Sequence, residues 1–375
     1  MKNEFKVIAD LIEKNKKVLD VGCADGTLMK FLKDNKNINI RGLEISKERV
    51  QECIAKGLTV IEGNAETDLK QFPDKSFDYV ILSQTLQAFL DPENVISELL
   101  RVGKKGQEKV AAVDSDNLIR DLSQYVKDLD PNTLNEGTLN KLTQIDLSKL
   151  NKINSNVRIG SCISNPVDFL AIGLNYKAHA EGTNSKLPTE PILFNKSSGC
   201  IQGPNDPILK PIAANKMDYE VEVAMVIGKE GKNISENNAQ EYVFGYCIVN
   251  DISERSWQKE RGGQWIKGKS IAGPTGPYLV TKDEIVDINN LNLSLDVNGE
   301  RRQTGNTERM IFNFNFLISH ISHFMTLYPG TIITTGTPAG TAMEMDMPKF
   351  LQVGDKLNLK VDHLGEQNHI VVEES

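Results

Sequence analysis

Three acidic residues lie in two neighbouring apolar segments with a spacing that suits a divalent metal ion. Glu220 and Glu222 belong to the segment DYEVEVAMVIG, and Asp251 directly follows the apolar run YVFGYCIVN. Successive side chains of an extended strand alternate between its two faces, so Glu220 and Glu222 are expected on the same face. Clustered carboxylates attract a hard cation, and because no histidine or cysteine accompanies the trio, Mg²⁺ or Mn²⁺ is favoured over zinc. The alternative is a solvated strand face, which is the commoner origin of a Glu-x-Glu pair.

Several distinctive segments surround this trio in a fixed order. They read IVNDISERSWQKERGGQWIKGKS, NGERRQTGNT, FMTLYPGTIITTGTPAG and FLQVGDKLNL. In order and approximate spacing they resemble the fumarylacetoacetate hydrolase family, and the resemblance covers about residues 104–375. The form of the first segment is most similar to the branch of acylpyruvate hydrolases and 2,4-diketo-3-deoxy sugar-acid hydrolases. The resemblance implies a mostly β catalytic domain with the mixed β-sandwich roll of this family.

The resemblance also implies roles for individual residues of this chain. The acidic trio matches the metal ligands, and His179 in GLNYKAHAEG matches the histidine that activates water. Relatives usually have a glutamate three residues after that histidine, whereas this chain has Gly182 there and Glu181 one position earlier. Position +2 points elsewhere on a regular helix, so Glu181 is expected to orient His179 only if the segment is an irregular loop.

Four further residues match positions that contact the substrate or the metal. Lys269 in KGKS matches a lysine beside the metal, where a cation can stabilise an enolate oxygen. Arg255 and Gln258 match positions that hold the far end of the substrate, and Thr337 in TTGTPAG matches a threonine that binds its carboxylate. A solvated loop and an ordinary tight turn are the alternatives for Lys269 and Thr337. The following segment GKSIAGPTGP is two residues shorter than in relatives, which would move that wall of the pocket.

The first hundred residues follow a different pattern. KKVLDVGCADG is an apolar strand that runs into a glycine-rich turn, and TLMKFLKDN, IRGLEI, SKERVQECIAKG, LTVIEGN and FDYVILS continue as alternating helices and strands. This alternation predicts a parallel, doubly wound, Rossmann-like α/β sheet. Gly22 and Gly26 would let a ligand approach the backbone, and Glu44 could accept from ribose hydroxyls, although a G-x-x-x-G spacing is weak evidence for a cofactor site.

Residues 1 to about 105 resemble the MetW family of class I S-adenosylmethionine methyltransferase-like proteins, as the continuation FPDKSFDYVILSQTLQAFLDPENVISELLRVGKK shows. The resemblance ends before the fifth strand and closing hairpin of such proteins, and Ala24 and Asn64 replace a usual glycine and a usual acidic residue. We therefore expect a truncated domain over residues 1–104 that does not bind S-adenosylmethionine. A small accessory module with a solvated helical connector is expected over 105–165, and the catalytic domain over 166–375.

Composition limits the classes of protein to which the chain can belong. A length of 375 residues with 39% hydrophobic residues predicts more than one globular core. The net charge of −8 argues against nucleic-acid binding, and the absence of a long apolar run or a signal-peptide core predicts a cytoplasmic protein without membrane contact. Five cysteines without CxxC spacing indicate neither a disulfide framework nor a zinc site. The expected partners are a keto-acid substrate and a second copy of the chain, as a homodimer.

These observations lead to the hypothesis of a metal-dependent hydrolase acting on carbon–carbon bonds. Cleavage of a small 2,4-dioxo acid, an acylpyruvate or a 2,4-diketo-3-deoxy sugar acid, would give pyruvate or a substituted pyruvate. His179 would deprotonate water, while the cation and Lys269 would absorb the charge of the enolate. An isomerase, decarboxylase or lyase would use the same enolate, so these reactions stay open. An alternative of another class is a catalytically weak scaffold protein with a MetW-like half, which the displaced Glu181 and the short segment after Lys269 favour.

Overall fold

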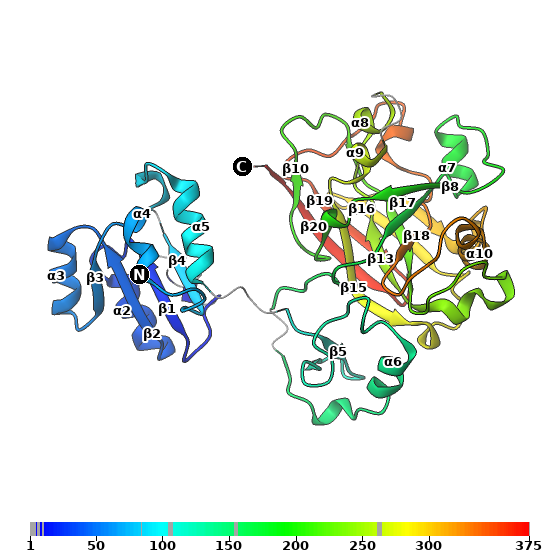
Figure 1. The fold of residues 1–375 in the computed structure, drawn as a ribbon. Helices are drawn as coiled ribbons and strands as arrows, with labels where there is room; N and C mark the ends of the chain where they lie inside the picture. The colour runs from blue at the N-terminus through cyan, green and yellow to red at the C-terminus, as the bar shows by residue number, and fades with distance from the viewer. Residues whose placement is uncertain are drawn as a thin grey trace. The chain divides into compact units, whose positions relative to one another are not determined.

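The chain divides into two compact units, residues 1–108 and 109–375, each of which is described here by itself (Figure 1). A computed structural model describes the chain over residues 5, 8–9, 11–83, 85–103, 108–153, 157–260 and 265–374. Each unit has its own hydrophobic clusters, and no described cluster mixes residues of the two. The two parts of the chain therefore have separate cores.

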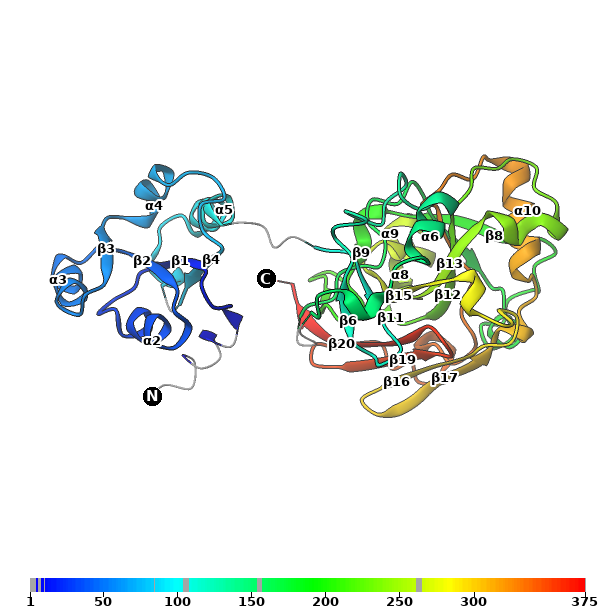
Figure 2. The same ribbon diagram turned by 90° about the horizontal axis from the view of Figure 1, so that it is seen from below.

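The first unit is a parallel four-stranded sheet with helices on both faces. The strand order is β3-β2-β1-β4. The apolar side chains of β1 alternate, so that Val18 packs with α2 and α3 on one face while Leu19 and Val21 pack with α4 and α5 on the other (Figure 2). The elements are β1 Lys17–Val21, β2 Asn39–Glu44, β3 Thr59–Glu62, β4 Tyr79–Leu82, α2 Thr27–Lys36, α3 Lys47–Ala55, α4 Ala65–Asp68 and α5 Pro92–Val102. The alternation of strands and helices predicted from the sequence is confirmed.

The first unit has no fifth strand within its described residues. Helix α5 ends at Val102, and the next residue, Gly103, forms a single parallel bridge with Phe77. Strand β3 at one edge has no fully buried residue, whereas β1 in the interior of the sheet is buried from Val18 to Val21. The sheet therefore has the four strands that the sequence predicted, and the described residues do not add a fifth.

A small module opens the second unit. It contains β5 Ala111–Val113, β6 Ile119–Asp121 and α6 Glu136–Leu142. Of the predicted helical connector, the described residues contain this short α-helix, which has no buried residue and is capped by Asn135, and a 3₁₀ turn at Leu147–Lys149. Asp130, just before the α-helix, accepts from the N–H groups of Asn132 and Thr133 and forms a turn. Leu134 and Ile163 are buried in a hydrophobic cluster with Ala224 of the catalytic sheet, so the module packs against that sheet.

The catalytic part is built on a seven-stranded mixed sheet of order β8-β7-β18-β12-β13-β15-β9. Its strands are β7 Phe169–Gly173, β8 Ile192–Lys196, β9 Ile201–Gln202, β12 Val221–Ile227, β13 Val243–Asn250, β15 Gly273–Thr281 and β18 Ile332–Thr334. Strand β12 is central and pairs antiparallel with β13 and β18. The helices of this part are α7 Lys177–Gly182, α8 Arg255–Lys259, α9 Trp265–Lys269 and α10 Phe314–Phe324, and a short pair is formed by β11 Met217–Asp218 and β14 Ser253–Glu254.

A second sheet of five strands, ordered β10-β20-β19-β16-β17, shares the main hydrophobic core with the first. Its strands are β10 Ile208–Lys210, β16 Asn292–Val297, β17 Glu300–Asn306, β19 Lys356–Val361 and β20 Gly365–Glu373. Val221 and Val223 of β12 enter this core, whereas Ala224 and Val226 lie in the cluster on the opposite face. The predicted mostly β architecture is confirmed, and β12 is buried on both faces.

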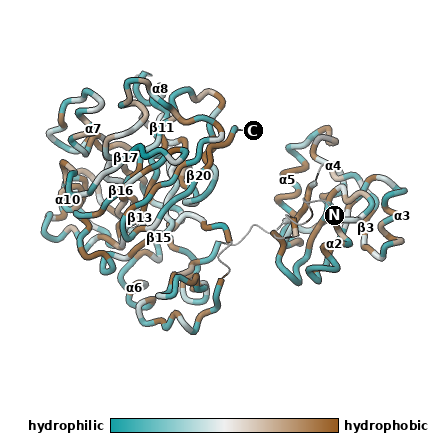
Figure 3. The backbone as a smooth tube through the Cα atoms, turned by 180° about the vertical axis from the view of Figure 1, so that it is seen from behind, coloured by the Kyte–Doolittle hydropathy of each residue, from teal (hydrophilic) through white to brown (hydrophobic). Residues whose placement is uncertain are grey.

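Hydrophobic and hydrophilic residues are interspersed along the chain in both units (Figure 3). None of the helices in the described residues has the length and the apolar character needed to cross a membrane.

The separate cores predict that residues 109–375 fold without the first unit. We expect this shorter chain to unfold cooperatively, with a melting temperature within about 4 °C of the corresponding transition in the full chain, the scale of a 1 kcal/mol change for a domain of this size. Circular dichroism during heating provides the measurement. An insoluble fragment, or a much lower melting temperature, would show that the first unit supports the second.

Candidate metal centre and active site

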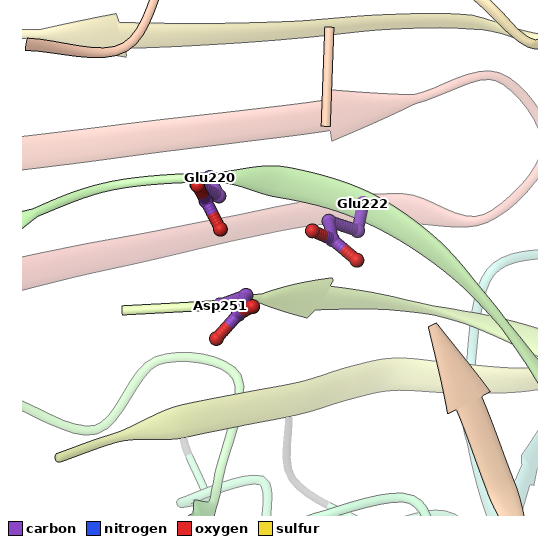
Figure 4. Close-up of side chains that lie close together, drawn as sticks. All are labelled: Glu220, Glu222 and Asp251. Atoms are coloured by element: carbon purple, nitrogen blue, oxygen red, sulfur yellow. The ribbon is translucent and has the colours of Figure 1, made fainter. Parts of the chain in front are cut away.

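The three predicted carboxylates meet where two antiparallel strands adjoin. Glu220 directly precedes β12, Glu222 is its second residue, and Asp251 directly follows β13. Val221 pairs with Asn250, and the Asp251 N–H donates to the Glu220 carbonyl oxygen at 2.9 Å, which fixes the start of one strand beside the end of the other. One carboxylate oxygen of each residue lies within 4.8 Å of those of the other two, and all three side chains are buried. Figure 4 shows the three side chains close together.

Three buried cations surround two of these carboxylates. Lys269 Nζ donates to Glu220 Oε2 and to Asp251 Oδ2, the latter at 2.9 Å. Lys196 Nζ donates to Asp251 Oδ1, and Arg255 Nη2 donates to Glu220 Oε1 at 2.6 Å. Burial alone would raise the pKa of Glu220, but Arg255 and Lys269 outweigh it and hold this pKa below its ordinary value. Glu220 is therefore an anion with two cationic partners.

Glu222 lacks such compensation. Its Oε2 accepts from the Gly336 N–H at 3.0 Å, and no lysine or arginine of the described residues forms an ion pair with it. Burial, together with the negative charges of Asp251 and Glu220, raises the pKa of Glu222 well above its ordinary value. An ionised Glu222 would leave uncompensated negative charge in the protein interior, which is costly.

The residues at this position fit a hard divalent cation. The ligands are carboxylate oxygens from two strand ends, which Mg²⁺ and Mn²⁺ prefer. The hydroxyl of Tyr176 is buried without a hydrogen-bond partner among the described residues. Burial, and the nearby Glu222, raise the pKa of this hydroxyl. A cation that carries water would neutralise Glu222 and supply polar partners in this region.

His179 has a different carboxylate partner from the predicted one. His179 lies on α7, and its Nδ1 is 2.6 Å from Glu344 Oε1 in the short 3₁₀ turn Ala342–Glu344. Glu181 is exposed and faces Lys177 at 3.8 Å on the outer side of the same helix. The prediction that Glu181 orients His179 is wrong, because α7 is regular and position +2 points away from the histidine.

The surroundings of Glu344 determine which nitrogen of His179 carries the proton. Glu344 also accepts from the Gly340 N–H at 3.1 Å and from the Thr341 hydroxyl at 2.8 Å. Burial alone would raise the pKa of Glu344, but the bonds from His179, Thr341 and Gly340 outweigh it and lower this pKa. An ionised carboxylate only accepts, so Nδ1 of the neutral imidazole is the donor and Nε2 keeps its lone pair.

Arg255 and Gln258 lie together on α8. Arg255 Nη1 donates to Gln258 Oε1 at 3.1 Å, and Arg255 Nε donates to Asp218 Oδ2 at 2.9 Å. The helix begins only at Arg255, after the short strand β14, so Asp251 lies outside it. The guanidinium group nevertheless reaches the acidic trio through Glu220.

Thr337 and the segment after Lys269 show how the rest of the site is built. The Thr337 hydroxyl donates to the Val221 carbonyl oxygen at 3.0 Å and accepts from Gln303 Nε2 at 2.8 Å. Lys269 reaches both Glu220 and Asp251 although the following segment is short. Residues 261–264, within the segment SERSWQKERGGQWIKGKS, lie outside the described residues.

The sequence reasoning missed three residues of the site, Lys196, Asp218 and Glu344. Lys196 is fully buried at the end of β8, and a lysine that closes an apolar strand was the available signal. Asp218 is fully buried and bonds to Arg255 from just before the acidic pair. Glu344 is 165 residues from His179 in sequence, and no local pattern links the two.

The three residues proposed for a cofactor in the first unit have contacts within the protein. Gly22 and Gly26 have φ values of 70° and 74°, and a Cβ there would lie 2.5 Å from Thr85 and 2.6 Å from Leu58. Glu44 accepts from two backbone N–H groups of adjacent loops, at 2.8 and 3.0 Å. Turn conformation and close packing therefore account for these residues.

Comparison with known proteins identifies the larger part of the chain. Residues 168–372, more than half of its length, match the model of the fumarylacetoacetate hydrolase C-terminal domain. The chain belongs to the fumarylacetoacetate hydrolase family. Residues 2–110 match the model of the methionine biosynthesis protein MetW, so both resemblances seen in the sequence are confirmed.

Relatives cover the fumarylacetoacetate hydrolase part of the chain. A protein of Burkholderia lata, named as a presumed hydrolase, is 47% identical over 273 residues, which are 72% of this chain and 97% of the relative. A fumarylacetoacetate hydrolase of Exiguobacterium antarcticum is 31% identical with a TM-score of 0.64, over 72% of this chain and 97% of its own. Maleylpyruvate hydrolase of Sphingobium sp. SYK-6, solved with manganese(II) and pyruvate, is 25% identical with a TM-score of 0.61, at the same coverages.

Replacing Glu222 by glutamine is expected to have opposite effects with and without metal. The raised pKa means that the folded protein retains a proton that the unfolded chain loses, so the contribution of Glu222 to stability falls as the pH rises above 4.5. At about pH 8 in chelator, Glu222→Gln should therefore melt several degrees higher than the parent. Added Mg²⁺ or Mn²⁺ should stabilise the parent more than the variant.

Scanning fluorimetry measures both effects, and Glu366→Gln is the matched control, because Glu366 is exposed on β20. A Glu222→Gln protein that the metals stabilise as strongly as the parent would place the cation elsewhere.

Proposed function

We propose that this fumarylacetoacetate hydrolase family member cleaves a carbon–carbon bond of a small 2,4-dioxo acid with the help of Mg²⁺ or Mn²⁺. The observation that carries the proposal is the buried carboxylate trio, in which one oxygen of each residue lies within 4.8 Å of those of the other two. The paired His179 and Glu344 and the ammonium group of Lys269 add a base and a cation to the same domain. The manganese and pyruvate of the Sphingobium relative support this choice of metal and product.

The metal would be held by Glu220, Glu222 and Asp251 and would supply Lewis-acid polarisation of the 2-oxo group of the substrate. The chain itself would bind and orient the substrate around this group. Arg255 and Gln258 are assigned to the far end of the substrate, as the family resemblance implies. Arg255 also contacts Glu220, which places both residues beside the trio. Thr337 is assigned to the substrate carboxylate. To donate to that carboxylate, its hydroxyl would have to give up the hydrogen bond that it donates to the Val221 carbonyl oxygen.

His179 is assigned the proton transfers. Its Nε2 would accept a proton from water, and the water oxygen would add to the 4-oxo carbon of the substrate. The bond between carbons 3 and 4 would then break, with its electron pair passing through carbon 3 to the 2-oxo oxygen as an enolate. Protonation of carbon 3 gives pyruvate or a substituted pyruvate, and carbon 4 leaves as a carboxylic acid.

Lys269 is assigned to the charge of the enolate. Its ammonium group has three N–H donors, of which two bond to Glu220 and Asp251. The third donor is assigned to the enolate oxygen, where a fixed cation in a buried site stabilises developing negative charge.

Isomerisation of a 2-oxo acid is the second candidate, because it would use the same enolate. A Mycobacterium abscessus protein named as a presumed 2-hydroxyhepta-2,4-diene-1,7-dioate isomerase is 29% identical to this chain with a TM-score of 0.62. An isomerase keeps the carbon skeleton of its substrate, whereas a hydrolase releases two acids, so product analysis separates the two reactions.

The alternative of a catalytically weak scaffold has less support than the sequence suggested. Its arguments were the displaced Glu181 and the short segment after Lys269. Glu344 provides a carboxylate for His179, and Lys269 still contacts two carboxylates of the trio. Both departures from the family pattern are thus compensated within the site.

Metal dependence is the direct test of the proposal. The chelator-treated protein should not release pyruvate from acylpyruvates, because the carboxylate trio would then lack its cation. Addition of Mg²⁺ or Mn²⁺ should restore the release. Coupling to lactate dehydrogenase measures pyruvate continuously. Full activity after exhaustive chelation contradicts the proposed function.

His179→Ala should separate chemistry from metal binding. The loss of a general base lowers turnover by roughly 10²-fold or more, while the carboxylate trio and its affinity for the metal stay intact. Turnover is measured by pyruvate release and metal affinity by calorimetry. His323→Ala on α10, an exposed histidine, is the control. Equal losses of turnover and metal affinity would mean that His179 has a structural role.

A further inference from the structure

Lys259, the last residue of α8, forms no ion pair with any carboxylate of the described residues. The adjacent Glu260 pairs with Lys216 instead. Residues 261–264, which come next in the chain and lie outside the described residues, are Arg, Gly, Gly and Gln and include no acidic side chain. The ammonium group of Lys259 is exposed, and its place in the fold indicates what it can bind.

Lys259 lies on the side of α8 that faces the carboxylate trio. It follows Arg255 by four residues, a spacing that places two side chains on one face of a helix. Arg255 reaches the trio through Glu220. Partial burial and the positive charge of Arg255 lower the pKa of Lys259. The other charged groups that act on Lys259 are Glu220, Lys269 and Asp218, so all of its charged neighbours belong to the site.

Arg255 and Lys259 differ in how far their hydrogen-bonding groups are already used. The guanidinium of Arg255 donates to Asp218, to Glu220 and to the Gln258 side chain. Lys259 has three N–H donors that no side chain of the described residues accepts. Two cations one turn apart on the same helix face repel each other, which destabilises the helix. A negatively charged group of a ligand would relieve this repulsion and accept from the free ammonium.

We propose that Lys259 binds a second carboxylate of the substrate, at the end far from the 2-oxo acid, and thereby makes the enzyme prefer 2,4-dioxo dicarboxylic acids. The inference rests on the proposed function, in which Arg255 and Gln258 contact the far end of the substrate. Lys259 directly follows Gln258, and it is exposed whereas Arg255 and Gln258 are buried. A substrate that extends from the trio past these two residues would therefore bring its terminal carboxylate to Lys259.

The position of Lys259 at the end of α8 also allows a purely structural role. A cation in the last turn of a helix interacts favourably with the carbonyl groups there. If this were its whole role, Lys259→Gln would lower the melting temperature and would affect all substrates to the same extent. A binding role instead makes the effect depend on the charge of the far end of the substrate.

The experiment uses acylpyruvates whose acyl part ends in a carboxylate, separated from carbon 4 by two to four methylene groups, and the terminal carboxamide of each. The ratio of kcat/KM for acid and amide is measured in the full chain with Mg²⁺ or Mn²⁺. Lys259→Gln removes the charge, and Lys259→Arg keeps it. Lys360→Gln, which neutralises an exposed lysine on β19, is the control.

We expect the parent to prefer the acid about fivefold or more at one of these lengths, the upper range for a solvent-accessible ion pair. The preference should lie mainly in KM and should fall as the salt concentration rises. Lys259→Gln should bring the ratio close to one, whereas Lys259→Arg and Lys360→Gln should retain the parental ratio. A parental ratio in Lys259→Gln overturns the proposal, as does an equal loss for acid and amide.

A binding measurement separates this inference from the proposed function. The 2-oxo acids of the same lengths lack the 4-oxo group and cannot be cleaved, and calorimetry gives Kd for each diacid and its amide. If the parent cleaves no acylpyruvate, the proposed function fails, but a tighter Kd for the diacid that disappears in Lys259→Gln still supports the assignment of Lys259. A parent without a difference between acid and amide in both measurements overturns it.

Discussion

The burial of like-charged carboxylates at the ends of two adjacent strands is the constraint on which the rest of the site depends. Antiparallel pairing of β12 and β13 brings Glu220 and Asp251 together, and burial keeps their charges away from bulk solvent. Lys269 and Lys196, with Arg255, compensate part of this charge from separate segments. Glu222 remains without a cationic partner among the described residues, so the uncompensated negative charge of the trio is concentrated at this residue.

The two-sheet architecture creates this constraint. One face of β12 packs on the second sheet, and the opposite face packs against the small amino-terminal module through Leu134 and Ile163. Both faces of the strand are therefore buried, and carboxylates on it require compensation of their charge by neighbouring groups. The module that begins this unit thus belongs to the environment of the carboxylate trio, since it covers the face of the sheet that carries the acidic side chains.

Local sequence patterns predicted much of this structure. The features that the sequence did not predict depend on contacts between residues far apart in the chain. The strands of the first unit and the shared face of Glu220 and Glu222 follow from residue periodicity, which a single sequence contains. The partner of His179 does not, because Glu344 lies 165 residues away and reaches the helix through the fold. The connector of the small module was predicted as helical, but its described α-helix is only Glu136–Leu142, and the Asp130 side chain bonds to the following backbone N–H groups and forms a turn before it.

The Glu344 carboxylate fills the space beside Gly182, where a Cβ would lie 2.4 Å from Oε2. This close approach bears on how the site can change over evolutionary time. A glutamate cannot move from one position to the other by a single substitution, because each step alone either crowds the site or leaves the histidine without its carboxylate. The two positions are therefore epistatic: the effect of a mutation at one depends on the residue at the other. A substitution at position 182 is therefore expected to act on His179 through the Glu344 carboxylate.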